Sequence, residues 1–129
     1  MNKREDLVFV LSKKDLEIKN EGYWALVCKR NEVEKLCQDV INEGLVEKCA
    51  YTDVKRSKTR LVRLYLNGED KLAHHKLILY LIKNKYIEKI HNKRYPNMMF
   101  TYLNSDKTFT LDTLMDLETG QFKRISEIW

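Results

Sequence analysis

The sequence predicts one α+β domain in which an antiparallel sheet carries two helices on one face. The chain has 129 residues, which is the usual length of a single domain, and its one proline and four glycines leave no recognisable linker. Two segments have the apolar spacing of amphipathic helices. The segments around them are short, apolar or aromatic, and separated by turns, which is typical of strands.

The first helix is predicted over 31–44, because Asn31 and Glu34 resemble a capping pair and glycine ends the segment. Its apolar stripe consists of Val33, Leu36, Cys37, Val40 and Ile41. The second helix is predicted over 72–85, with Asp70 or a neighbour as its N-cap.

Strands are predicted on both sides of these helices. The core is predicted at 23–92 and has the order β-α-β-β-α-β of ferredoxin-like folds. Its strands are predicted over 23–29, 45–55, 60–66 and 86–92. Residues 1–22 are predicted to form an N-terminal extension, and 93–129 to add C-terminal β-strands over 98–103, 109–117 and 121–128. The alternative is the cap-binding initiation-factor fold, which also places helices on one side of a curved antiparallel sheet.

Composition points to a cytoplasmic protein without a cofactor. No run approaches the ~18 apolar residues of a membrane helix, and the apolar stretch at 7–11 is too short for a signal peptide. The three cysteines lack Cys-x-x-Cys spacing, so we expect reduced, mostly buried thiols and no metal site. No motif for a cofactor occurs, and none is expected.

Positive charge favours an acidic or polyanionic partner, although it also promotes solubility. The chain has 24 Lys and Arg against 19 Asp and Glu, a net charge of +5. The densest group spans the turn predicted at 56–59 between two strands and consists of Lys55, Arg56, Lys58, Arg60 and Arg63. A projecting hairpin with these cations could neutralise several phosphates. The alternative interpretation is a solvated turn.

A second candidate surface lies on the strand at 60–66. The period of two places Leu61, Arg63 and Tyr65 on the face away from the helices, where an Arg beside a Tyr could stack nucleic-acid bases. If the C-terminal strands cover this face, the same side chains are packing residues. Arg94, close to the turn at Pro96, is a further candidate contact.

The histidines are the candidates for catalysis. His74, His75 and His91 could serve a metal-independent ribonuclease as general acid and base. His74 lies on the apolar stripe of the second predicted helix, which favours a histidine satisfied by a backbone or side-chain partner. No phosphate-binding glycine loop and no nucleophile elbow occurs. We therefore expect a non-enzymatic protein, with the ribonuclease as the enzymatic alternative.

The C-terminal third is rich in aromatic residues. They are predicted to form the second half of the core, and the alternative is a protein-binding patch that would make the chain an inhibitor of another protein. The members are Tyr95, Phe100, Tyr102, Phe109, Phe122 and Trp129.

The short Lys- and Asn-rich chain, with dense turns and hardly any proline, resembles the small early proteins of T4-type bacteriophages. That group includes an RNA polymerase-binding protein of similar size and a translational repressor that binds messenger RNA. The resemblance implies a viral regulator of transcription in the host cytoplasm. Its partner would be RNA polymerase, another nucleic-acid-associated protein, or RNA or DNA itself. Because the likeness concerns length and composition, it transfers no functional residue.

Overall fold

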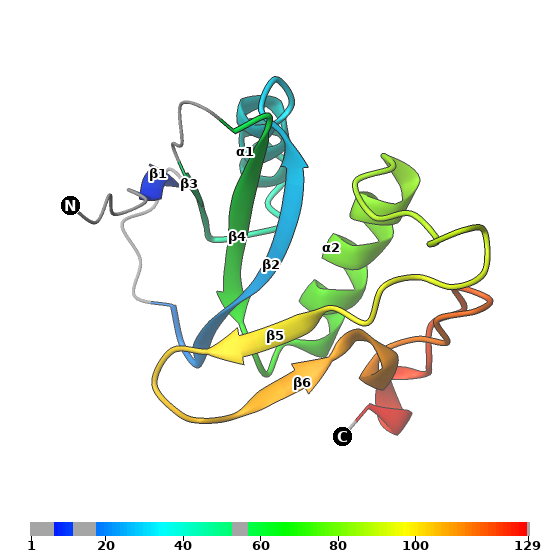
Figure 1. The fold of residues 1–129 in the computed structure, drawn as a ribbon. Helices are drawn as coiled ribbons and strands as arrows, with labels where there is room; N and C mark the ends of the chain where they lie inside the picture. Colours follow the sequence, from blue (N-terminus) through cyan, green and yellow to red (C-terminus); the bar gives the residue numbers. More distant parts are fainter. Residues whose placement is uncertain (1–6, 12–17, 53–56, 129) are drawn as a thin grey trace.

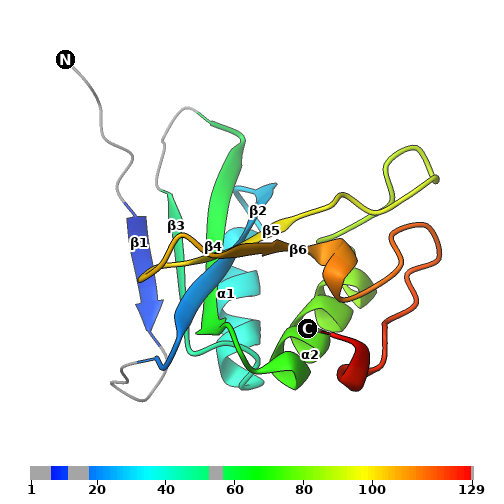
Figure 2. The ribbon, with the colours of Figure 1, turned by 90° about the horizontal axis from the view of Figure 1, so that it is seen from below.

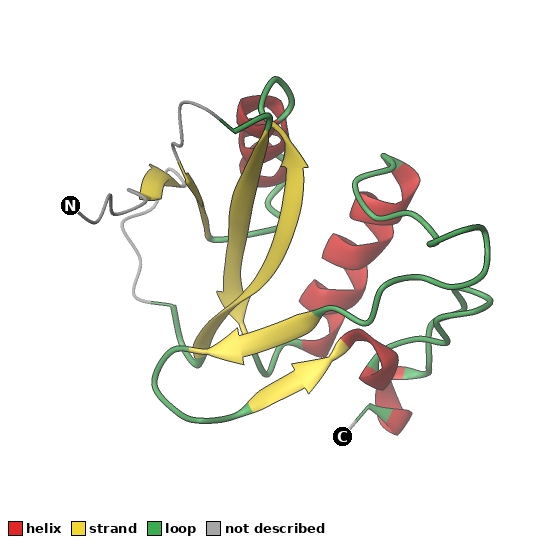
Figure 3. Cartoon of the chain, viewed as in Figure 1, coloured by secondary structure: helices red, strands yellow, loops and turns green. Residues whose placement is uncertain are grey.

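The fold class predicted from the sequence is confirmed. A computed structural model describes residues 7–11, 18–52 and 57–128, of which 7–11 are described by their backbone (Figure 3). These residues form a six-stranded antiparallel sheet and two α-helices, an α+β arrangement. 

The sheet has the strand order β1-β3-β4-β2-β5-β6, and every neighbouring pair is antiparallel (Figure 1). Its strands are β1 (Leu7–Leu11), β2 (Glu21–Lys29), β3 (Lys48–Thr52), β4 (Thr59–Asn67), β5 (Met99–Tyr102) and β6 (Thr108–Thr110). The helices are α1 (Val33–Asn42) and α2 (Lys71–Lys83), followed near the C-terminus by two short 3-10 turns, Leu111–Thr113 and Ile125–Glu127.

The ferredoxin-like arrangement is approached but not exactly reproduced. The chain passes through β2, α1, β3, β4, α2 and β5, which is the expected alternation. The strand after α2, however, lies at Met99–Tyr102 and not at 86–92. Strands β1 and β6 extend the sheet at its two edges, so part of the predicted N-terminal extension at 1–22 belongs to the sheet.

The predicted strand at 86–92 is wrong because the chain is still closing the end of α2. The amides of Tyr86 and Ile87 both donate to the Leu81 carbonyl, and Lys85 has a φ of 61°. His91 and Asn92 also have positive φ, which builds a turn closed by the single bridge between Ile90 and Arg94. A strand requires negative φ throughout, so the apolar residues here pack from a loop.

The predicted strand at 121–128 is also wrong, and the one at 109–117 is shortened to β6. Asp116 accepts hydrogen bonds from the amides of Glu118 and Thr119, and Gly120 has a φ of 76°. This side-chain-to-backbone turn competes with a strand ladder. One bridge, between Met115 and Phe122, is what pairs the two sides of the turn.

Both helices begin and end within a few residues of the predicted positions. Asp70 caps α2 by accepting a hydrogen bond from the Ala73 amide at 3.1 Å. Helix α1 ends before Gly44, which has a φ of 69°, and the Leu45 amide donates to the Val40 carbonyl. The cap predicted at Asn31 is absent, since Glu32 is the N-cap residue and makes no side-chain capping hydrogen bond.

The two helices cover one face of the sheet (Figure 2). Alternate residues of β2 and β4 point toward them, and the resulting core includes Trp24, Leu26, Val62 and Leu64. The C-terminal aromatic residues contribute to this same core: Phe100 is fully buried, and Tyr95, Tyr102, Phe109 and Phe122 pack against it. Trp129 lies outside the described residues.

Strand β5 pairs with β2 at Gly22, Tyr23 and Trp24 and lies close to it there (Figure 1). A Cβ atom on Gly22 would lie 2.6 Å from both Phe100 Cζ and the Thr101 carbonyl oxygen. Glycine is therefore required at this position, because any side chain would separate β5 from β2.

The expectation of three reduced thiols is wrong for one pair. Cys37 of α1 and Cys49 of β3, both fully buried, form a disulfide with a Cα–Cα distance of 5.8 Å. The pair arises where α1 packs on β3, a proximity that sequence spacing does not reveal. Cys28 is a free and buried thiol whose pKa is raised to about 11, chiefly by burial.

We expect the disulfide to contribute to stability by closing the loop between Cys37 and Cys49. The double variant Cys37→Ala with Cys49→Ala should lose about 3 kcal/mol of unfolding free energy without reductant. Cys28→Ala is the control, since it removes a buried sulfur but no cross-link. Urea unfolding followed by circular dichroism measures both. Equal losses would contradict a stabilising cross-link.

Candidate nucleic-acid interface

Positive charge gathers at one end of the sheet, where β2 ends and β4 begins. Lys29 is the register partner of Thr59, and the Arg30 amide donates to the Lys58 carbonyl at 2.9 Å. Lys29, Arg30 and Lys58 are exposed. We call these three residues the basic end (Figure 1, top). 

Sequence reasoning identified Lys58 but missed Lys29 and Arg30. The signal is present, because Lys29 ends the predicted strand 23–29, Arg30 follows it, and pairing with the predicted strand 60–66 would bring both to the hairpin. Lys55 and Arg56 lie outside the described residues. They belong to the connection between β3 and β4 that leads directly to Lys58.

Arg60, predicted to contact a phosphate, points into the protein. Arg60 is 5% exposed, and it is the register partner of Cys28 on the face of the sheet that the helices cover. The guanidinium Nη1 donates to the carbonyl oxygens of Ser57 and Thr59, both at 2.9 Å. The prediction that Arg60 offers its charge to a ligand is therefore corrected: the guanidinium ties the base of the hairpin together.

The helix-free face holds a cluster of cations and tyrosines, as the period of two predicts for Arg63 and Tyr65. The Arg63 guanidinium lies over the Tyr23 ring at 4.7 Å from its centroid, and Lys48 Nζ lies over the Tyr65 ring at the same distance. The two rings are 5.4 Å apart. Lys48 also forms an ion pair with Glu21 at 2.7 Å.

This arrangement does not offer an open stacking platform. Tyr65 is 3% exposed, and a cation of the protein lies over each of the two rings. The interpretation of Tyr65 as a base-stacking residue is corrected for this reason. Arg63 is half-buried, and its Nε has no hydrogen-bond partner among the described residues.

Arg94 belongs to the loop at 84–98, and this loop lies on the other side of the molecule from the end of β2 (Figure 1). Arg94 lines a hollow of about 780 Å³ against the C-terminal turns. The hollow contains both signs of charge, with Lys123 and Arg124 beside Asp116 and Glu118. Arg94 is therefore not joined to the hairpin cations in one surface.

His74 is buried and has a partner, as its position on the apolar stripe predicts. The Trp24 indole Nε1–H donates to His74 Nδ1 at 3.0 Å. Since Nδ1 accepts, Nε2 carries the proton and donates to the Gly68 carbonyl at 2.9 Å. Burial lowers the pKa of His74, and the Gly68 carbonyl and Asp70 only partly oppose this.

The three histidines occupy different settings. His74 is 0% exposed and both ring nitrogens are engaged, so it cannot exchange a proton with a substrate in this state. His75 stacks on Phe122 with ring centroids 4.1 Å apart, and His91 is exposed on a turn. This placement removes His74 from the acid–base pairs that the ribonuclease alternative requires.

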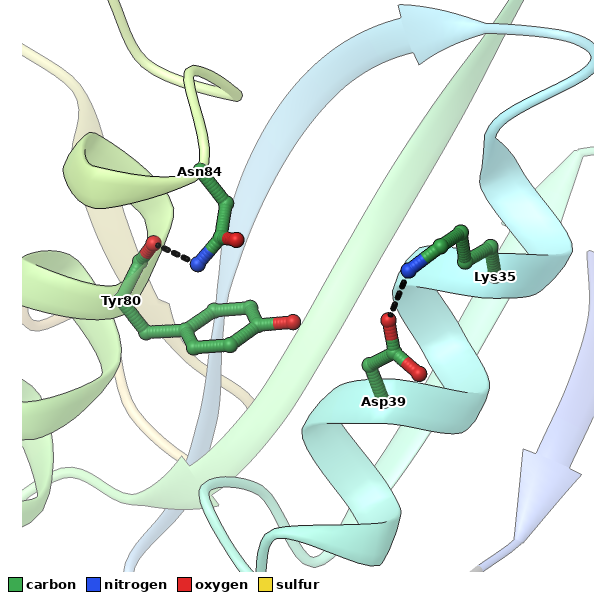
Figure 4. A network of polar contacts seen from close by, with 4 residues as sticks. All are labelled: Lys35, Asp39, Tyr80 and Asn84. Atoms are coloured by element: carbon green, nitrogen blue, oxygen red, sulfur yellow. Dashed lines mark hydrogen bonds and ion pairs between the residues drawn. The ribbon is translucent and has the colours of Figure 1, made fainter.

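The region between the two helices contains local contacts (Figure 4). Lys35 Nζ pairs with Asp39 at 2.7 Å within α1, and Asn84 Nδ2 donates to the Tyr80 carbonyl at the end of α2. The Tyr80 side chain points toward α1, and burial followed by the charges of Asp39 and Glu43 raises its pKa. These contacts are within the helices and present no site.

Among residues 7–11, 18–52 and 57–128, no three potential ligands come together to hold a metal ion. No helix in this part of the chain is long and apolar enough to cross a membrane. No protein-family model, curated protein or solved structure matches the chain.

We expect Arg60→Ala to affect stability and not binding. The change removes two hydrogen bonds of a buried guanidinium and should lower the unfolding free energy by about 2 kcal/mol. Lys58→Ala, an exposed neighbour, should leave stability within about 0.5 kcal/mol. Chemical unfolding measures the unfolding free energy of both variants, and titration of the folded variants with RNA measures their binding affinity. A stable Arg60→Ala variant would contradict the structural role.

Because the imidazole of His74 is buried, we expect the unfolding free energy to decrease as the pH falls. Its folded pKa lies below 6.5, so the unfolded chain takes up the proton first as the pH falls below 6.5. Stability is then lost toward lower pH, by at most about 1.4 kcal/mol per pH unit from this group. His74→Gln should reduce the slope of unfolding free energy between pH 7 and 5. His75→Gln is the control and should keep it, and equal slopes in both variants would contradict the assignment.

Proposed function

We propose that the protein is a non-enzymatic regulatory module that docks through its basic end on a nucleic-acid machine such as RNA polymerase, or directly on nucleic acid. The observation that carries this proposal is the convergence of Lys29, Arg30 and Lys58 on one end of the sheet. In the sequence, Lys55 and Arg56 stand three and two residues before Lys58.

Charge spacing supports an anionic partner. Arg30 follows β2 and Lys58 precedes β4, and the Arg30 amide donates to the Lys58 carbonyl at 2.9 Å, so their Cα atoms are held about one strand spacing apart, roughly 5 Å. Successive phosphates on a nucleic-acid strand are separated by several ångströms, so adjacent cations can contact neighbouring phosphates. The sheet register holds the backbones in place, which reduces the entropy lost on binding.

A charge-matched pair of variants tests the role of the basic end. In the first, Lys29, Arg30 and Lys58 become Ala; in the second, the exposed Lys76, Lys83 and Lys107 become Ala. Each removes three positive charges, so a difference reports location and not net charge. We expect the first to weaken binding of a labelled single-stranded RNA at least tenfold and to reduce the salt slope by about 0.7 per lost phosphate contact. Equal affinities would sink the proposal.

Recovery of partners from cell lysate distinguishes docking on a protein machine from direct binding to nucleic acid. The wild-type protein and the basic-end variant are used as baits, each with and without nuclease. RNA polymerase subunits that survive nuclease and require the basic end would indicate docking on the machine. Loss of all partners after nuclease would indicate direct nucleic-acid binding. Identical partners for both baits would remove the basic end from the docking surface.

A further inference from the structure

One edge of the sheet is formed by a strand whose sequence is the same in both directions. Strand β1 reads Leu7-Val8-Phe9-Val10-Leu11 and pairs with β3 on one side. It is the terminal strand of the sheet order, so no described strand pairs with its other side. All five residues are apolar, and none is the charged residue or proline that commonly protects an edge from pairing.

A strand with this symmetry can pair with a copy of itself. In an antiparallel pair about a two-fold axis through Phe9, Leu7 faces Leu11 of the second copy and Val8 faces Val10. Phe9 faces its own equivalent. The axis maps each residue onto one of the same parity, and alternate residues direct their backbone groups to the same edge. Donors therefore meet acceptors whichever set of β1 groups faces outward.

We propose that two copies of the chain associate through β1 in an isologous dimer with a continuous sheet. The pairing satisfies the backbone groups of both edges and places each residue opposite a like residue of the second copy. Because the axis is perpendicular to the sheet, the helices of both copies cover the same face. The opposite edge, β6, has three residues and offers fewer backbone bonds.

The size of the contact sets the expected affinity. Two five-residue strands bury less than the ~1,200 Å² at the lower limit of a standard interface. We therefore expect a reversible dimer with a dissociation constant in the micromolar range. Light scattering with size-exclusion chromatography should show a mass rising from 15.5 kDa toward twice that value as concentration increases from about 5 to 500 µM. A monomer throughout this range would overturn the dimer.

Charge complementation at Phe9 tests the register. Phe9→Lys and Phe9→Glu each place like charges opposite one another, so each variant alone should be monomeric. An equimolar mixture places Lys opposite Glu and should recover the dimer. Recovery excludes simple unfolding as the cause of dissociation, and circular dichroism of each variant checks the fold. Dimers in either variant alone, or a mixture that stays monomeric, would overturn pairing centred on Phe9.

Cross-linking provides a second readout that needs no charge. Phe9→Cys should form a disulfide-linked dimer on mild oxidation, because residue 9 lies opposite itself. Leu7→Cys should do so at least fivefold more slowly alone, and rapidly when mixed with Leu11→Cys. The native Cys28 is buried with a pKa raised to about 11, which keeps its thiol protonated and slow to react. Equal rates for Phe9→Cys and Leu7→Cys alone would contradict the register.

Discussion

The hydrogen bonds through His74 join three parts of the molecule. Trp24 is on β2, Gly68 closes the turn after β4, and His74 is on α2, so one imidazole links the sheet, the turn and the helix. The ring also lies edge-on to Phe100 and Phe109, with centroids 4.8 and 5.2 Å away. Both nitrogens must remain engaged, because a buried polar group without a partner costs about 1–3 kcal/mol.

This arrangement explains how β5 and β6 are held across β2. Trp24 contacts Phe100 and Phe109 edge-on, and Gly22 removes the side chain that would block the approach. The aromatic cluster is therefore a packing device of the C-terminal third, with Phe100 at its centre and fully buried. Trp24 and Phe100 are fully buried in this cluster, whereas Phe109 is partly buried.

The sequence predicts elements whose side chains follow a regular period, and it fails where local turns compete with that period. Helices α1 and α2 and the central strands β2 and β4 lie within a few residues of their predicted positions. The segment 86–92 was apolar enough for a strand, but Lys85 and His91 adopt positive φ. At the C-terminus, the Asp116 side chain bonds two amides and turns the chain. Neither event changes the apolar pattern from which strands are predicted.

In the candidate site, too, the regular period of a strand predicts which face a residue occupies, whereas strand pairing decides which residues come together. The period of two correctly places Arg63 on the helix-free face and Arg60 on the other, yet charge density alone groups them in one surface. Register separates them and adds Lys29 and Arg30 to Lys58. The basic end therefore depends on the pairing of β2 with β4, whereas the dimer depends on β1 at the far side of β3. Antiparallel pairing of two β1 strands directs the two basic ends in opposite directions along the strands. A dimer would thus contact two separate anionic surfaces, and its affinity for a single short strand should equal that of the monomer.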